Sequence, residues 1–118
     1  MFEIVALMLL THQPMQPTME GHASFYASSR QLQVTASGER LKDDEFTCAM
    51  RDGVFGEYYL VVAENGKSVV CKLNDRGPYA PGRVIDLSKS AMRALEINGD
   101  VITVKVYRLG DKPPRSPS

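Results

Sequence analysis

The chain has 118 residues, of which 43% are hydrophobic and 24% are charged, as is typical of one folded domain. Fourteen basic and fourteen acidic side chains give a formal net charge of zero. This balance argues against a general electrostatic grip on nucleic acid or on an anionic membrane. No apolar run reaches the roughly 18 residues of a transmembrane helix. Two cysteines are too few for a disulfide scaffold, and no residue spacing supports a metal site.

The two ends of the chain differ from its middle. Residues 4–10 form an apolar run, and a polar, proline-containing stretch leads to residue 20. One interpretation of residues 1–20 is an export signal, although Glu3 stands where a basic residue is usual. The other is a strand or apolar segment that docks on a protein partner. Residues 110–118 contain three prolines and are expected to form an extended tail, so the folded domain is expected over 21–109.

Hydrophobic patterning predicts a mainly β chain. Strands are expected over 22–27, 57–63, 67–73, 84–87 and 101–107. Asn65-Gly66 is a strong signal for a hairpin between two of them. Loops are expected over the polar residues 36–45 and over 74–83, which contain two Gly and two Pro.

One short helix is expected near the C-terminal end of the domain. Ser88 can cap a helix that runs to about Glu96, with Leu87 and Met92 as a hydrophobic staple. The pair Asn98-Gly99 is expected to stop the helix. A small barrel would remove the exposed strand edges of such a chain.

Five blocks of sequence, in one order, resemble the rare lipoprotein A family. They are GHASFYA (21–27), TASGERL (35–41), FTCAMRDGVFG (46–56), ENGKSVVCKLNDRGP (64–78) and NDRGPYAPGRVIDLSKSAMRAL (74–95). The resemblance runs from Gly21 to about Val106. It implies a six-stranded double-psi β-barrel with one or two short helices, and no cofactor. It also implies action on bacterial peptidoglycan, in the cell envelope, in the periplasm or outside the cell.

Two carboxylates are candidate catalytic residues. Asp75 stands in the Asn-Asp-Arg-Gly-Pro motif, whose Asp is the catalytic acid in family members that cleave glycan strands. One carboxyl group suffices there, because it protonates the bridging oxygen and then accepts a proton from the muramic acid 6-hydroxyl. The alternative for Asp75 is a turn-forming Asp. Asp86 is the second candidate, and its alternative is an acceptor for backbone groups at the helix start.

Four residues are candidates for binding the substrate. Ser24 and Tyr26 share one face of the first predicted strand, which lines the groove in the resembled family. Arg76 either clamps a substrate carboxylate or ties down its own loop. Tyr79, in the same loop, is the fourth candidate.

The sequence departs from the family at Met50, where active members carry a His. A methionine cannot transfer a proton. His22 shares a strand face with Ser24 and is either a substitute near the site or a solvated side chain. Cys48 and Cys71 either form one disulfide or remain buried thiols.

Three hypotheses follow for the function. The first is a lytic transglycosylase-type enzyme that uses Asp75 as general acid and base. The second is a barrel that binds glycan without cleaving it, because Met50 has replaced the His. The third is a structural part of an envelope or phage-like assembly, which contacts a protein partner through residues 1–20.

Overall fold

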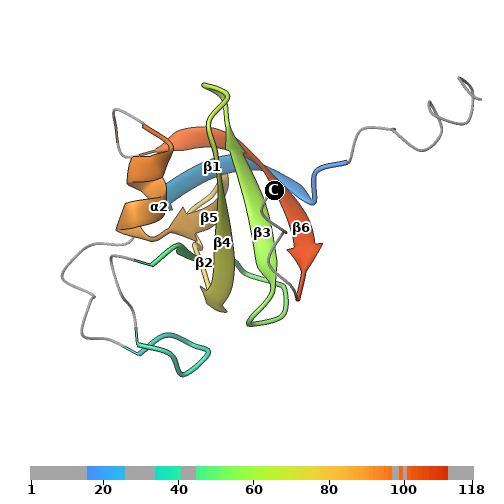
Figure 1. The fold of residues 1–118 in the computed structure, drawn as a ribbon, viewed down its shortest axis with the longest axis vertical. Helices are drawn as coiled ribbons and strands as arrows, with labels where there is room; N and C mark the ends of the chain where they lie inside the picture. The colour runs from blue at the N-terminus through green and yellow to red at the C-terminus, as the bar shows by residue number, and fades with distance from the viewer. Residues whose placement is uncertain (1–15, 26–33, 41–44, 97–98, 100, 112–118) are drawn as a thin grey trace, which may run out of the picture.

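The computed structural model describes residues 16–25, 34–40, 45–96, 99 and 101–111. These residues form six strands and one helix: β1 (Met19–Phe25), β2 (Thr47–Ala49), β3 (Tyr58–Ala63), β4 (Ser68–Asp75), β5 (Arg83–Leu87), α2 (Lys89–Ala94) and β6 (Ile102–Gly110). The strands close into one barrel in the order β1-β5-β2-β4-β3-β6 (Figure 1). The predicted mainly β, six-stranded barrel is therefore confirmed.

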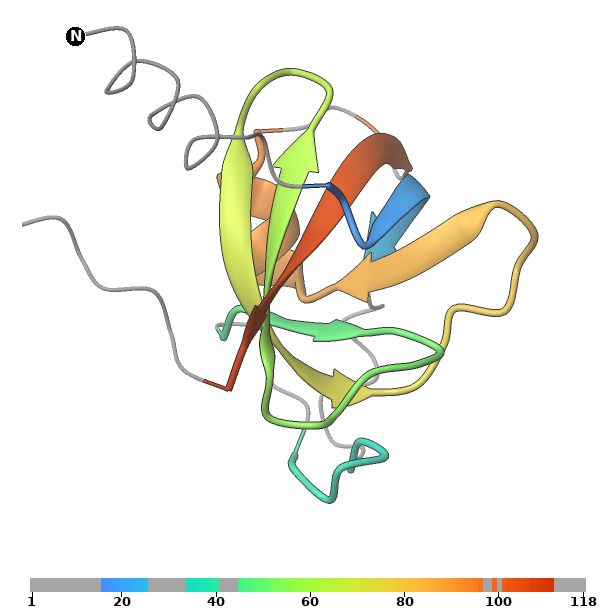
Figure 2. The same ribbon diagram turned by 90° about the vertical axis from the view of Figure 1, so that its right-hand side faces the viewer.

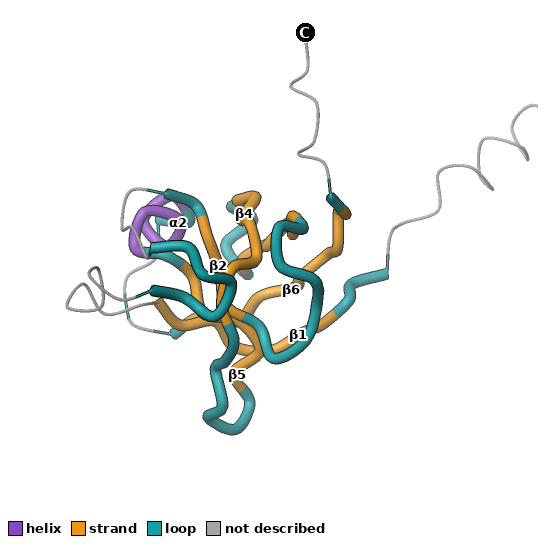
Figure 3. The backbone as a smooth tube through the Cα atoms, turned by 90° about the horizontal axis from the view of Figure 1, so that it is seen from below, coloured by secondary structure: helices purple, strands orange, loops and turns teal. Residues whose placement is uncertain are grey.

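The barrel mixes parallel and antiparallel pairs. β1 pairs with β5 and β2 pairs with β4 in parallel, and the other four neighbouring pairs are antiparallel. β2 lies between β4 and β5, so it separates two strands that follow each other in the sequence. Figure 3 shows the helix α2 at one side of the barrel, seen from below.

Alternating side chains fill the interior. In β3 every second residue is buried, and β6 alternates in the same way over its first five residues. Burial of each large apolar side chain contributes about 1.5–3 kcal/mol of favourable transfer free energy. The largest fully buried apolar side chains are Tyr59, Leu73, Ile85, Leu87 and Leu95.

The structure differs from the sequence predictions at β2 and at the end of β4. β2 was not predicted as a strand, because three residues carry too little periodicity to show one. Asn74 and Asp75 were expected in a loop but are the last two residues of β4. They stay in the barrel because Ala49 of β2 pairs with Asp75.

Other boundaries moved by only a few residues. β1 begins at Met19, and Thr18 already donates a backbone hydrogen bond to Val106. β6 continues to Gly110 because β3 pairs with it as far as that residue. Most of the N-terminal extension (1–15) and of the C-terminal tail (112–118) lies outside the described residues, as does Tyr26.

The helix follows its predicted start and ends early. Ser88 is its N-cap and accepts a hydrogen bond from the Ala91 amide, and Leu87 and Met92 both belong to the core. The C-cap is Leu95. Glu96 then adopts a positive φ of 54°, which turns the chain before Gly99 is reached.

Cys48 and Cys71 are free, fully buried thiols. Burial, followed by a hydrogen bond with Cys71, raises the pKa of Cys48 well above its usual value. The structure therefore has the thiol arrangement rather than the disulfide. In the part of the chain that the structure describes, no helix has the length and apolar character to cross a membrane.

Candidate functional site

The pairing of four strands aligns a row of small and acidic residues, of which Ser24, Ala49 and Asp75 are buried. Ala49 of β2 pairs with Asp75 of β4 on one side and with Asp86 of β5 on the other, and Asp86 pairs with Ser24 of β1. Cys48 and Ala49 are both buried, and the register between β2 and β4 shifts between them. Asp75 and Asp86 therefore lie on either side of Ala49, on the two strands that neighbour β2.

Asp75 is the most firmly held residue of this row. Its side chain is mostly buried, and Oδ1 accepts hydrogen bonds from the backbone amides of Ala36 (3.0 Å) and Arg76 (2.9 Å). The main-chain carbonyl oxygen of Asp75 accepts a third hydrogen bond, from the Met50 amide at 3.2 Å. The pairing register of β4 with β2 shifts at this point, so that Asn74 is an extra residue in the strand. These bonds fix the rotamer of the carboxyl group.

The segment 34–40 covers Asp75 and was not among the predicted site elements. A bridge between Val34 and Arg40 closes it, and the Ser37 amide donates to the Asn74 carbonyl at 3.0 Å. Lys72 of β4 holds its far end through an ion pair with Glu39 at 2.8 Å. The hydrogen bond with Glu39 raises the pKa of Lys72. A backbone donor leaves no side-chain signal in a sequence, so this support was not predicted.

Asp86 is half-buried and accepts a hydrogen bond from the Ser24 hydroxyl. It does not serve the helix start, the alternative role considered for it. Ser88 takes that role, because its Oγ accepts from the amides of Ala91 (3.4 Å) and Thr47 (3.1 Å). The structure therefore brings together the predicted residues Ser24, Asp75 and Asp86.

Arg76 points its guanidinium group at the loop between β2 and β3. Its Nη2 donates to the Gly53 carbonyl at 2.7 Å, its Nη1 lies 3.5 Å from the Met50 carbonyl, and its guanidinium carbon stacks 4.1 Å from the centre of the Phe55 ring. This geometry favours the interpretation that Arg76 ties down a loop. Gly53, whose carbonyl accepts this bond, has a φ of +108°, a conformation that glycine adopts without strain.

The structure places Met50 and His22 in different surroundings. Met50 is buried and belongs to the hydrophobic core. His22 is exposed, and it pairs with Arg83, three residues before Asp86 on β5. A register shift follows His22, and Ser24, two residues later, pairs with Asp86. Tyr79 is three-quarters exposed in the loop after Asp75.

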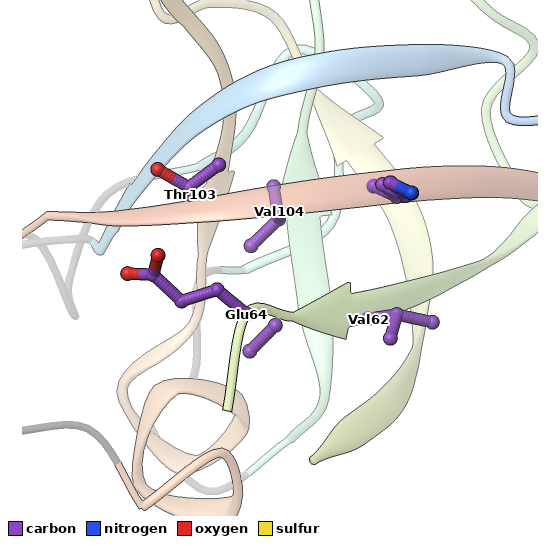
Figure 4. A pocket seen from close by; sticks show the side chains of 6 residues that line it. Val62, Glu64, Thr103 and Val104 are labelled. Carbon is purple, nitrogen blue, oxygen red and sulfur yellow. The ribbon is translucent and has the colours of Figure 1, made fainter. Parts of the chain in front are cut away.

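A cavity of about 260 Å³ opens elsewhere, between β3 and β6 (Figure 4). None of the predicted site residues lines it, and its lining consists of Val62, Ala63, Glu64, Thr103, Val104 and Lys105. Among the described residues, no group of three or more His, Cys, Asp or Glu is placed to hold a metal ion.

Known proteins resemble the chain in sequence. The family model described as "Lytic transglycolase" matches residues 18–106. A probable endolytic peptidoglycan transglycosylase RlpA from Treponema pallidum is 44% identical over 91 residues, which are 75% of this chain and 29% of that protein. The protein of the same name from Nostoc is 42% identical over 97 residues, which are 79% of this chain and 26% of that protein. The chain therefore spans less than a third of either relative.

Solved structures share the fold at low sequence identity. An expansin from Clavibacter michiganensis superposes with a TM-score of 0.61 at 21% identity, over 83% of this chain and 52% of that one. A Streptomyces papain inhibitor gives a TM-score of 0.55 at 18% identity, over 80% of this chain and all of that one. These likenesses show the fold alone. The family match and the closed mixed barrel together establish that the chain belongs to the lytic transglycolase family and forms an RlpA-like double-psi β-barrel.

Proposed function

We propose that this barrel cleaves the glycan strands of peptidoglycan, with Asp75 as the residue that carries the proton. The observation that carries the proposal is the fixed carboxyl group of Asp75, held by two backbone amides in one row with Asp86 and Ser24. The relatives' names, which specify an endolytic peptidoglycan transglycosylase, support the choice of substrate. Peptidoglycan lies in the cell envelope, which is therefore the proposed place of action.

The proposed reaction needs one carboxyl group. Asp75 donates its proton to the oxygen that bridges two sugars, and the bond from the anomeric carbon to that oxygen breaks. The 6-hydroxyl of the muramic acid then bonds to the anomeric carbon and returns its proton to Asp75. The product is an anhydro ring, and the carboxyl group is restored.

The proposed scheme does not require Asp86. Asp75 and Asp86 stand on either side of Ala49, two strand spacings apart. Asp86 is bonded to Ser24, on the side of β5 away from Asp75. We assign Asp86 and Ser24 to binding sugar hydroxyls, and Arg76 to holding its loop.

The test is product analysis on peptidoglycan with and without its stem peptides. The full chain, Asp75→Asn and Asp86→Asn are each incubated with the glycan, and mass spectrometry detects anhydro-muramic ends. Asp52→Asn, an exposed carboxylate in the β2–β3 loop, is the matched control. We expect Asp75→Asn to lower the rate at least about 100-fold, as loss of a general acid does, and Asp52→Asn to leave it unchanged. An unchanged rate in Asp75→Asn would exclude Asp75 as the proton carrier.

One observation favours a second candidate function, glycan binding without cleavage. The position of the family's His is held by Met50, whose side chain is buried in the core and has no proton to exchange. In that case the wild-type chain would sediment with insoluble peptidoglycan but release no anhydro products. Sedimentation and product analysis of the same sample separate the two functions.

A further inference from the structure

Large apolar side chains are exposed around the carboxylate row. Five large hydrophobic residues among those described are exposed, and three of them are Val34, Val54 and Tyr79. Their exposed fractions are 63%, 64% and 75%, the three highest of the five. Single exposed apolar residues are ordinary, but a group of them around one site indicates a binding surface.

The three residues belong to three segments, of which one is bonded to Asp75, one is bonded to Arg76, and one follows both in the chain. Val34 is two residues from Ala36, whose amide lies 3.0 Å from Asp75 Oδ1. Val54 follows Gly53, whose carbonyl accepts the 2.7 Å hydrogen bond from Arg76. Tyr79 is in the loop that continues from Asp75 and Arg76.

In Figure 2 the segment 34–40 (teal) and the β2–β3 loop (green) lie at the lower end of the barrel, and the loop from β4 to β5 rises from that end to the upper right. Hydrogen bonds hold the first two loops against Asp75 and Arg76, so Val34 and Val54 are presented on a preorganised support.

We infer that Val34, Val54 and Tyr79 form an apolar rim that holds the C–H faces of sugar rings on either side of the reacting bond. This inference rests on the proposed function and adds to it the way in which the strand is bound. A pyranose ring carries hydroxyl groups at its edge and C–H groups on its faces, so it needs both polar and apolar contacts. The row of Ser24, Asp86 and Asp75 supplies the polar contacts, and the rim supplies the apolar ones. The Tyr79 ring offers the flat surface on which a sugar face stacks.

The rim predicts that glycan affinity depends on apolar contact and is separable from catalysis. The experiment uses the full chain carrying Asp75→Asn, so that the probe is not cleaved. The probe is soluble peptidoglycan glycan without stem peptides, and calorimetry measures its Kd. Val54→Ser and Tyr79→Ala are introduced singly. Val62→Ser is the matched control, because Val62 of β3 is also a partly exposed valine but pairs with Ser68, at the opposite end of β4 from Asp75.

We expect Tyr79→Ala to raise Kd about 3- to 10-fold, as loss of an aromatic contact does. Val54→Ser should raise Kd about 2- to 5-fold through lost apolar burial, and Val62→Ser should leave it unchanged. Substitutions of exposed side chains alter stability little, so folding does not obscure the result. Unchanged Kd values in both rim variants would overturn the inference, as would an equal effect of Val62→Ser.

The outcomes also separate the rim from the proposed function. Cleavage by the wild-type chain with unchanged Kd values in the rim variants would overturn the rim and leave Asp75 catalysis in place. Binding that depends on Val54 and Tyr79, without cleavage by the wild-type chain, would support the rim and contradict catalysis. Absence of any binding by both the wild-type chain and Asp75→Asn would overturn the rim.

Discussion

Two substitutions of Asp75 should separate its structural contribution from its chemical one. The carboxyl oxygen Oδ1 accepts hydrogen bonds from the Ala36 and Arg76 amides at 3.0 and 2.9 Å. Asp75→Asn keeps an oxygen that can accept both bonds, but it has no acidic proton to give. Asp75→Ala removes the acceptor as well. Both variants should lose glycan cleavage, and only the alanine variant should lose stability.

The size of the stability loss follows from the two bonds. A typical hydrogen bond contributes about 1 kcal/mol net, so two lost acceptors cost about 2 kcal/mol. Since Asp75 is only 8% exposed, water reaches the abandoned amides poorly. With a urea m-value of about 2 kcal/mol per molar, the unfolding midpoint of Asp75→Ala should fall by about 1 M. Asp75→Asn should stay within about 0.5 M of the wild type.

Urea denaturation followed by far-ultraviolet circular dichroism measures this difference, and product analysis on the same preparations measures cleavage. Equal midpoints for Asp75→Ala and Asp75→Asn would refute the reasoning. That result would mean that segment 34–40 does not depend on the carboxyl group for its position.

Three further predictions concern the scaffold. Ser88→Ala should lower the free energy of unfolding by about 1–3 kcal/mol, because the helix loses its cap and the Thr47 amide of β2 loses its acceptor. The control Ser90→Ala should change the free energy of unfolding by under about 0.5 kcal/mol. Equal effects of the two substitutions in urea titrations would contradict the prediction. Gly53→Ala should cost about 2–4 kcal/mol, because its φ is +108° and the new Cβ would lie 2.7 Å from two buried side chains. Gly56→Ala, also at positive φ but in open space, should cost less, and the reverse order in thermal melts would refute the packing argument. Burial raises the pKa of Cys48, so iodoacetamide should not label this thiol at pH 8 until the chain unfolds. The contribution of the neutral Cys48 thiol to the free energy of unfolding should be full below the unfolded pKa of about 8.5, and it should be lost as the pH rises toward the pKa of the folded state. Rapid labelling of the native protein, read by mass spectrometry, would show the prediction to be wrong.

Local signals in the sequence were sufficient for much of the fold. Alternating apolar residues located five of the six strands, and the predicted Asn65-Gly66 turn does join β3 to β4. The cap at Ser88 located the start of the helix within one residue. Each of these signals acts over a few neighbouring residues, so it needs no knowledge of the rest of the chain. The resemblance in five ordered blocks indicated the family, which the family match confirmed.

The arrangement of the candidate site needed the tertiary structure. β2 has three residues, and its identity as a strand comes from β4 and β5, which pair with it on both sides. Only that pairing shows that Asp75 and Asp86 flank the same alanine.

The two roles of Arg76 were equally compatible with its sequence, and its bonds to the carbonyls of a distant loop favour the role of holding that loop. The sequence by itself thus determined the elements, the family and the carboxylates to examine. The closed barrel decided which of them lie side by side, because contacts across strands depend on register, and register is a property of the whole sheet.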